Sequence, residues 1–405
     1  MRNLIRKAPS WVKKPIKYVY GLIPYERRLG KVFWETYNFL QESQWWSKEK
    51  LEEYQMKELE KLLKHAYENV PYYRRVFDER GLKPEDIQDF DDLQKLPYLT
   101  KDTFRERFNR KEIISKNINL SKMLISHTSG TTGKPLQFYV NKDTDAKEWA
   151  FICHQWSRVE YKPGDKRIEL RGAINKKKPI FYGKLENIIR FSPIIENREK
   201  AKLYLKVMEE FGAKYLHGYP GAIASFALLI KQYNLNINFK LKAILFASEI
   251  IYEWERKIAE EVFGCRIFSH YGCAEKVILA AECEKNQIYH CLPQYGVTEF
   301  DPQTKEVIAT GFLNTVNPFI RYKMTDVALN PQFKFCHKCR RNYYPIFDGI
   351  EGRLEDFIVT PEGSLISPAI ITHPFKDLKA IKNTQIIQKN TENINLVLLS
   401  IYKIF

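Results

Sequence analysis

The chain has 405 residues, 44% of them hydrophobic and 28% charged, which excludes a wholly disordered protein and suffices for one large domain and a smaller one. Its net charge of +16 favours an anionic partner such as a nucleotide, a coenzyme or an acidic lipid surface, and without any nucleic-acid-binding signature we expect no nucleic-acid partner. Seven cysteines do not make a disulfide scaffold, and with neither a signal peptide nor an apolar run of membrane-spanning length we expect a cytoplasmic protein.

The first segment, residues 1–31, is a basic arm interleaved with aromatic side chains. Prolines interrupt any long amphipathic helix in it. Two interpretations stay open: a solvated arm packed on the domain, and a surface that lies peripherally on an anionic membrane. The basic residues of the arm are Arg2, Arg6, Lys7, Lys13, Lys14, Lys17, Arg27, Arg28 and Lys31.

Helical periodicity begins at residue 48. Apolar residues at three- and four-residue spacing predict a helix over 48–69, and a second helix is expected to run to residue 80, before Gly81. Thr100 is a suitable N-cap for the helix that carries Phe104 and Phe108. Two short strands are expected next, at 124–125 and 136–140.

The middle of the chain alternates between helical and strand patterns. We expect residues 162–198 to be irregular, and the remaining segments to alternate as in an α/β fold with a parallel sheet. The expected helices are 143–158, 199–211, 222–233 and 253–263, and the expected strands are 215–218, 242–247 and 266–270.

From residue 287 onward, short β-like runs dominate, at 297–300, 307–309, 319–322, 357–359, 385–388 and 396–401. Two glycines and a charge cluster within 349–356 mark the best domain boundary. The expected organisation is the arm (1–31), a large α/β domain (32–352) with parallel and mixed sheets flanked by helices, and a short, incomplete α+β domain (353–405).

The loop between the strands at 124–125 and 136–140 reads Thr128-Ser-Gly-Thr-Thr-Gly-Lys134-Pro135. Backbone N–H groups, hydroxyls and an ammonium in one turn form a cradle for phosphate oxygens. A polar hairpin turn is the plainer interpretation. The loop is not the NTPase P-loop, because Thr128 stands where that motif has its first glycine and Pro135 where it has Ser or Thr.

This loop resembles the phosphate loop of the adenylate-forming (acyl-activating) superfamily, without a substitution. Four further segments match motifs of that superfamily in the same order: Ser248-Glu249, Tyr271–Glu275, Arg321–Asp326 and Gly352–Asp356. Together with Pro71-Tyr72-Tyr73 and Leu96-Pro97, they narrow the resemblance to the phenylacetate–coenzyme A ligase branch, especially its relatives encoded with capsular polysaccharide genes.

The resemblance implies ATP, Mg²⁺ and coenzyme A as ligands. Lys134 and Glu275 are the expected catalytic residues; Glu275 would hold Mg²⁺ against the phosphates, and Asp326 would bind the ribose hydroxyls. The full set of expected nucleotide-binding residues is Thr128, Ser129, Gly130, Thr131, Thr132, Gly133, Ser248, Glu249, Tyr271, Gly272, Asp326 and Arg353. The chain departs from the motifs at Ala274, where the superfamily has threonine, and at Thr325, where it has glycine.

The acyl group has an expected pocket at the segment before the helix at 222–233. In the family this region lines the acyl site, with Gly221 and Ala222 leaving room and Tyr219 stacking on the substrate. Without the resemblance, the same residues indicate only the start of a helix.

Cysteine and histidine residues form another candidate site. Cys283 is followed by His290 after six residues, and Cys336 and Cys339 form a CxxC pair. Two such pairs can complete a tetrahedral zinc shell, and a related site in some members of the branch supports a structural Zn²⁺; free thiols are the alternative. Cys291 and His337 are alternative ligands, whereas Cys153, Cys265 and Cys273 are expected to take no part.

The expected function is ATP-dependent activation of a carboxylate as an acyl-adenylate, followed by transfer to coenzyme A or another acceptor in capsule or polysaccharide metabolism. The superfamily places a further adenylation lysine near the far end of a longer C-terminal domain, and neither Lys389 nor Lys403 has its glycine-rich context. A truncated nucleotide-binding homologue with little turnover is therefore the alternative. A peripheral membrane or capsule-assembly partner is the third.

Overall fold

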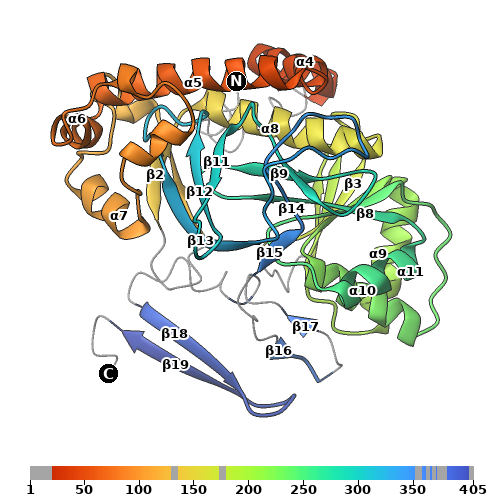
Figure 1. Cartoon of the computed structure of the whole chain (residues 1–405). Helices are drawn as coiled ribbons and strands as arrows, with labels where there is room; N and C mark the ends of the chain where they lie inside the picture. Colours follow the sequence, from red (N-terminus) through yellow and green to blue (C-terminus); the bar gives the residue numbers. More distant parts are fainter. Residues whose placement is uncertain are drawn as a thin grey trace.

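The structure, a computed structural model, describes residues 21–128, 136–172, 179–351, 358–361, 365–366, 371 and 381–400. A mixed nine-stranded sheet forms its centre, in the strand order β14-β10-β9-β8-β7-β6-β3-β5-β4 (Figure 1). Strands β5, β3, β6, β7 and β8 run parallel, and the flanking strands pair antiparallel. The strands are β3 (Arg167–Leu170), β4 (Ile180–Gly183), β5 (Ile188–Phe191), β6 (Tyr215–Gly218), β7 (Ala243–Phe246), β8 (Arg266–Gly272), β9 (Leu279–Glu282), β10 (Tyr289–Cys291) and β14 (Ile346–Phe347).

Helices cover both faces of this sheet, as a parallel sheet requires. On one face, α4 (Lys31–Ser43) and α8 (Lys142–Trp156) pack against alternate strand residues such as Tyr215, Leu245 and Phe268. On the other face, α9 (Arg198–Phe211), α10 (Pro220–Gln232) and α11 (Glu253–Phe263) cover the intervening residues, among them Leu216 and Ile244. The two-residue alternation of a strand thus divides each strand between two cores.

A third core joins the N-terminal helices to a four-stranded antiparallel sheet and a hairpin. The sheet has the order β11 (Gly296–Phe300), β12 (Glu306–Gly311), β13 (Tyr322–Leu329), β15 (Gly349–Glu351), and the hairpin is β1 (Leu124–His127) with β2 (Gln137–Val140). The helices that supply this core are α5 (Lys48–Asn69), α6 (Pro71–Asp78) and α7 (Lys101–Asn109). Short helices complete this part at Tyr25–Leu29 (α3), Pro84–Asp86, Asp91–Lys95, Leu120–Lys122 and Ser157–Val159.

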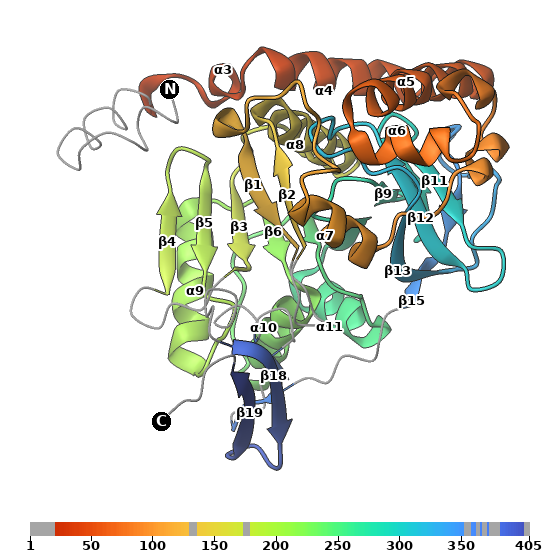
Figure 2. The same cartoon turned by 90° about the vertical axis from the view of Figure 1, so that its left-hand side faces the viewer.

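The described C-terminal residues form two small antiparallel pairs, β16 (Ile358–Val359) with β17 (Leu365–Ile366) and β18 (Ile381–Gln388) with β19 (Ile394–Ser400). Figure 2, turned by 90°, again shows the β18–β19 hairpin apart from the large sheet. The predicted domain boundary at residue 352 falls outside the described residues and stays a prediction. Among the described residues, no helix is both long and apolar enough to cross a bilayer.

The predicted α/β class is confirmed, and the helices predicted over 48–69 and 253–263 have the predicted bounds. The prediction that 162–198 is irregular was wrong, because β3, β4 and β5 lie within it. Strand β3 was not predicted because two of its four residues, Arg167 and Glu169, are charged, which is unusual for a buried strand. In the structure the two side chains form an ion pair of 3.0 Å. The strand predicted at 319–322 begins only at its last residue, and α4 was not predicted at all.

Candidate functional site

The loop Thr128–Pro135, which we call the phosphate-type loop, connects strands β1 and β2 of the hairpin. Thr128 closes its base: its backbone N–H donates to the Leu136 carbonyl at 3.0 Å, and its Oγ1 accepts from the Leu136 N–H at 2.8 Å. Leu136 and Phe138 are buried in the core that also contains Tyr322. The expected binding residues Ser129, Gly130, Thr131, Thr132 and Gly133, together with Lys134, lie outside the described residues, so their roles stay predictions.

Glu275, the expected Mg²⁺ ligand, follows the carboxyl end of β8 and is buried, with 4% of its surface exposed. Its Oε1 accepts a hydrogen bond of 2.8 Å from the hydroxyl of Tyr322, at the start of β13. Burial is the main cause that raises the pKa of Tyr322, and the negative charge of Glu275 raises it further. The phenol therefore stays protonated and holds the carboxylate in one orientation. Tyr322 belongs to the Arg321–Asp326 motif, but sequence reasoning assigned it no role.

A second tyrosine–carboxylate pair joins the same two strands. The Tyr271 hydroxyl on β8 donates to Oδ2 of Asp326 on β13 at 2.7 Å. Burial raises the pKa of Asp326, although the hydrogen bond from Tyr271 opposes this shift. The carboxylate keeps further acceptor sites, as binding of two ribose hydroxyls would need. Tyr271 and Asp326, distant in sequence, are thus brought together as expected for one site, with the ligand itself still a prediction.

Thr325, which precedes Asp326, has the left-handed backbone conformation, with φ of 67°. Glycine adopts this conformation without strain, whereas a β-branched residue is strained in it. This geometry gives a physical reason for the glycine that the superfamily has at this position. The substitution by threonine leaves the conformation in place at an energetic cost.

Most of the remaining expected residues follow the ends of β7 and β6. Ser248 is exposed, with φ of 73°, and Glu249 next to it is half-buried. Tyr219, 6% exposed, precedes α10, and Gly221 and Ala222 are buried in the first turn of that helix. Gly272 ends β8 and pairs with Leu279 of β9. Arg353 lies outside the described residues.

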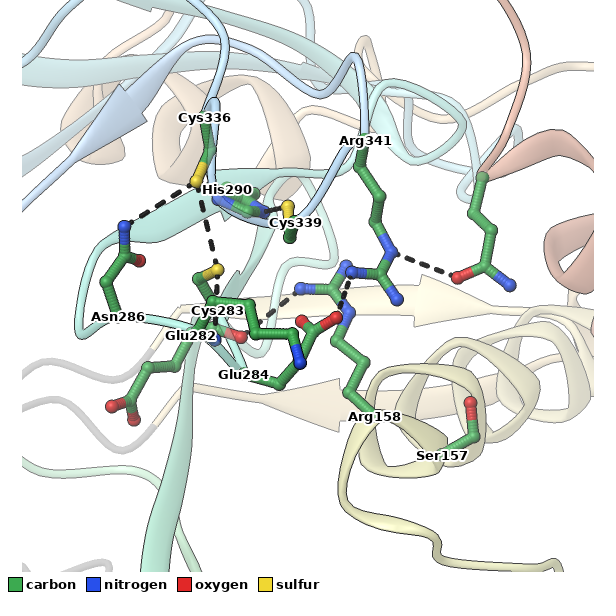
Figure 3. Close-up of polar contacts among 12 residues, drawn as sticks. Ser157, Arg158, Glu282, Cys283, Glu284, Asn286, His290, Cys336, Cys339 and Arg341 are labelled. Carbon is green, nitrogen blue, oxygen red and sulfur yellow. Dashed lines mark hydrogen bonds and ion pairs between the residues drawn. The ribbon is translucent and has the colours of Figure 1, made fainter.

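Cys283, His290, Cys336 and Cys339 come together in a buried group whose candidate ligand atoms all lie within 4.8 Å of one another. The Sγ atoms of Cys283 and Cys336 are 3.9 Å apart, and Cys339 Sγ is 3.9 Å from His290 Nδ1 (Figure 3). Tetrahedral zinc with Zn–S bonds of about 2.3 Å separates two sulfurs by about 3.8 Å, so these residues fit that metal. Cys291 and His337, the alternative ligands, are not part of the group.

A charged network that the sequence did not reveal surrounds this Cys/His group. Arg341 donates to Glu284 at 2.5 Å and to Gln44 of the α4 C-terminus at 3.0 Å, and Arg158 after α8 donates to the Glu282 carbonyl at 3.2 Å (Figure 3). The Asn286 side-chain amide donates to Cys336 Sγ at 3.6 Å. The Cys/His group joins the β9–β10 turn to the loop before β14, and the charged network connects both segments to helices α4 and α8.

Comparison with known proteins gives relatives along most of the chain. A phenylacetate-coenzyme A ligase from Thermus thermophilus is 34% identical over 333 residues, which cover 77% of this chain and 72% of that protein. Protein CapK from Staphylococcus aureus is 25% identical over 403 residues, which cover 94% and 84% of the two chains. No protein-family model matches the chain.

Among solved structures, the fold is similar to that of a 2-hydroxyisobutyryl-CoA ligase. In its postadenylation state, in complex with R3-HIB-AMP, that protein has a TM-score of 0.58 and 18% identity, with 85% of this chain and 77% of the other covered. The structure of its open conformation with 2-HIB-AMP and CoA gives a TM-score of 0.57 over 85% and 83% of the two chains. At this level of identity, the likeness concerns the fold.

Proposed function

The chain belongs to the phenylacetate–coenzyme A ligase family, and from this membership we propose that it activates a carboxylic acid with ATP and transfers the acyl group to coenzyme A. In the first step, a carboxylate oxygen attacks the α-phosphorus of ATP and pyrophosphate leaves. In the second step, the coenzyme A thiolate attacks the acyl carbon and AMP leaves. The expected role in capsule or polysaccharide metabolism stays a prediction.

One observation carries the proposal: two carboxylates, one just after β8 and one on β13, are each held by a tyrosine hydroxyl from the other segment. Tyr322 bonds to Glu275 at 2.8 Å, and Tyr271 bonds to Asp326 at 2.7 Å. Tyr322 shares a core with Leu136, the residue that directly follows the phosphate-type loop. The carboxylates suited to metal and to ribose therefore lie close to each other, and this closeness supports the proposal.

The proposed chemistry is mainly positioning and charge neutralisation. Mg²⁺, when bound, would neutralise phosphate charge, and Glu275 is the residue that would hold it. Asp326 would fix the ribose by accepting hydrogen bonds from its hydroxyls, and Lys134 would attract the leaving phosphates. The two tyrosines keep both carboxylates in fixed orientations before the substrate arrives, which lowers the entropic cost of assembling the reactive complex.

The experiment is ATP-dependent pyrophosphate release, measured against a panel of aryl and aliphatic acids, with coenzyme A added in a second series. We expect release that needs both acid and Mg²⁺, and a much lower rate for Glu275→Gln. Lys206→Met is the matched control, because Lys206 on α9 has 71% of its side chain exposed. Saturable ATP binding without release from any acid would favour the nucleotide-binding homologue without turnover.

We also propose that the Cys/His group binds one structural Zn²⁺. Three thiolates and one imidazole are a common structural zinc set, and all four residues are buried away from competing water. The metal would fasten the loop before β14 to the β9–β10 turn, so its role is stability rather than catalysis. Elemental analysis of purified protein tests this: about one equivalent of zinc is expected, and less than about half an equivalent contradicts it.

A further inference from the structure

A row of residues that includes the polar side chains of Arg171 and His270 lies at the carboxyl ends of the central parallel strands. Leu170, Gly218, Phe246 and Ser269 are in register across β3, β6, β7 and β8. Arg171 directly follows Leu170 at the end of β3, and His270 follows Ser269 within β8. Ligands of α/β proteins bind beyond the carboxyl ends of the strands. Neither residue has been given a role in nucleotide or metal binding.

Arg171 is half-buried and touches a histidine rather than a carboxylate. Its Nη1 lies 2.7 Å from Nε2 of His217, and His217 Nδ1 lies 2.9 Å from the Leu245 carbonyl oxygen. A guanidinium only donates hydrogen bonds, so Nε2 must accept and Nδ1 must carry the proton. Burial, and then the charge of Arg171, lowers the pKa of His217 well below its usual range. The histidine is neutral and leaves the charge of Arg171 uncompensated.

The nearest acidic residue in sequence, Glu169, is already occupied. Its two oxygens pair with Arg167 at 3.0 Å and with Arg190 at 2.5 Å. No ion pair to Arg171 occurs within the described part of the chain. Other buried arginines do have carboxylate partners, for example Arg256, Arg321 and Arg341. Among the described residues, no carboxylate therefore neutralises the fixed positive charge of Arg171, so this charge can attract an anionic ligand.

Two neighbours make the surroundings of Arg171 suitable for a ligand. His270 Nδ1 is buried and has no hydrogen-bond partner among the described residues, and burial followed by the charge of Arg171 lowers the pKa of His270 to about 3. The Tyr219 ring centre lies 5.9 Å from the Arg171 guanidinium carbon. The row thus combines a cation, an unpartnered polar nitrogen and an aromatic face.

We propose that Arg171 binds a second carboxylate of the acyl substrate, so that the preferred substrates are dicarboxylic acids. This inference rests on the proposed function, with the nucleotide, and hence the reacting carboxylate, at the ends of β7 and β8, where the expected nucleotide-binding residues Ser248 and Tyr271 lie. Arg171 directly follows β3, which is two strands from β7, and strands are spaced by about 4.8 Å, so roughly 10 Å separates the ends of β3 and β7. A ring or a medium-length chain therefore separates the two carboxylates. A bidentate guanidinium–carboxylate pair provides both affinity and orientation.

The test compares acids that differ only in the second carboxylate, namely suberate with octanoate and terephthalate with benzoate. Wild-type protein should show a KM for the diacid lower than that for the monoacid by about tenfold or more. Arg171→Met should raise the KM for the diacid by a similar factor and leave kcat and the monoacids little changed. Arg171→Lys should retain part of the preference, and Lys206→Met all of it.

Calorimetric titration of the diacid into nucleotide-free protein gives a readout independent of turnover, and thermal melts verify that each variant is folded. Diacid binding that Arg171→Met abolishes supports the inference even if pyrophosphate is never released, in which case the proposed function fails alone. Turnover of monoacids without preference for diacids overturns the inference and leaves the proposed function intact. An equal loss with both acids in Arg171→Met also overturns it, because Arg171 would then bind the reacting carboxylate.

Discussion

The left-handed backbone at Thr325 gives a prediction whose size follows from the structure. An L residue in this conformation costs about 1–2 kcal/mol, whereas glycine avoids that strain but loses about 0.5–1 kcal/mol through its greater freedom in the unfolded chain. Thr325 is exposed, with φ of 67°, so replacing it sacrifices little packing. Thr325→Gly should therefore be more stable than Thr325→Ala by roughly 0.5–1 kcal/mol, the reverse of the usual order.

Leu329 on the same strand provides the matched control, because it is 41% exposed and is not among the residues with positive φ. There, glycine should be less stable than alanine by about 0.5–1 kcal/mol. Urea unfolding of the four variants gives both differences, and subtracting one from the other leaves the strain at Thr325, about 1–2 kcal/mol. If glycine destabilises both positions equally, the backbone at Thr325 is not strained and our reason for the superfamily's glycine is wrong.

Three further predictions concern a buried acid, the Cys/His group and the nucleotide site. Burial raises the pKa of Glu255 to about 7, so its contribution to the free energy of unfolding is present below pH 4.5 and is lost as the pH rises through 7. Relative to Glu255→Gln, the wild type should therefore lose up to about 3 kcal/mol of stability between these two pH values. Parallel plots of stability against pH for the two proteins would contradict this. Cys339→Ser and prolonged treatment with a zinc chelator should each lower the melting temperature, because each removes the proposed metal site. Cys265→Ser, outside the group, is the control and should leave the melting temperature unchanged. An unchanged melting temperature in Cys339→Ser argues against the proposed metal. Tyr271→Phe removes the hydrogen bond to Asp326 and should weaken ATP binding by about tenfold, measured by titration, with equal affinity in both proteins as the refuting result.

Local patterns in the sequence predicted many of the elements and the composition of the candidate site. Periodicity predicted α5, and the capping residue Thr100 predicted α7, where its hydroxyl accepts from the Thr103 N–H in the first turn. The matched motifs pointed to Glu275 and Asp326, and the Cys/His spacing pointed to all four residues of the buried group. These signals are local in the chain, and each element or motif carries its own.

Other features depend on residues that are far apart in the sequence. Strand β3 looked irregular because its charges, Arg167 and Glu169, are compensated only after folding brings Arg190 alongside them. The pairing of Tyr322 with Glu275 joins residues 47 positions apart, and Arg341 meets Gln44 across 297 positions. No spacing rule connects such partners.

The sequence by itself determined the class of fold, the order of its motifs and the residue types available for phosphate, metal and ribose. Only the tertiary structure decided which charges are compensated. Glu169 is fully paired, whereas Arg171, directly after the end of the same strand, faces a neutral histidine. The physical reason is that electrostatic compensation depends on distances between side chains of different strands, and these distances are fixed by sheet order and register.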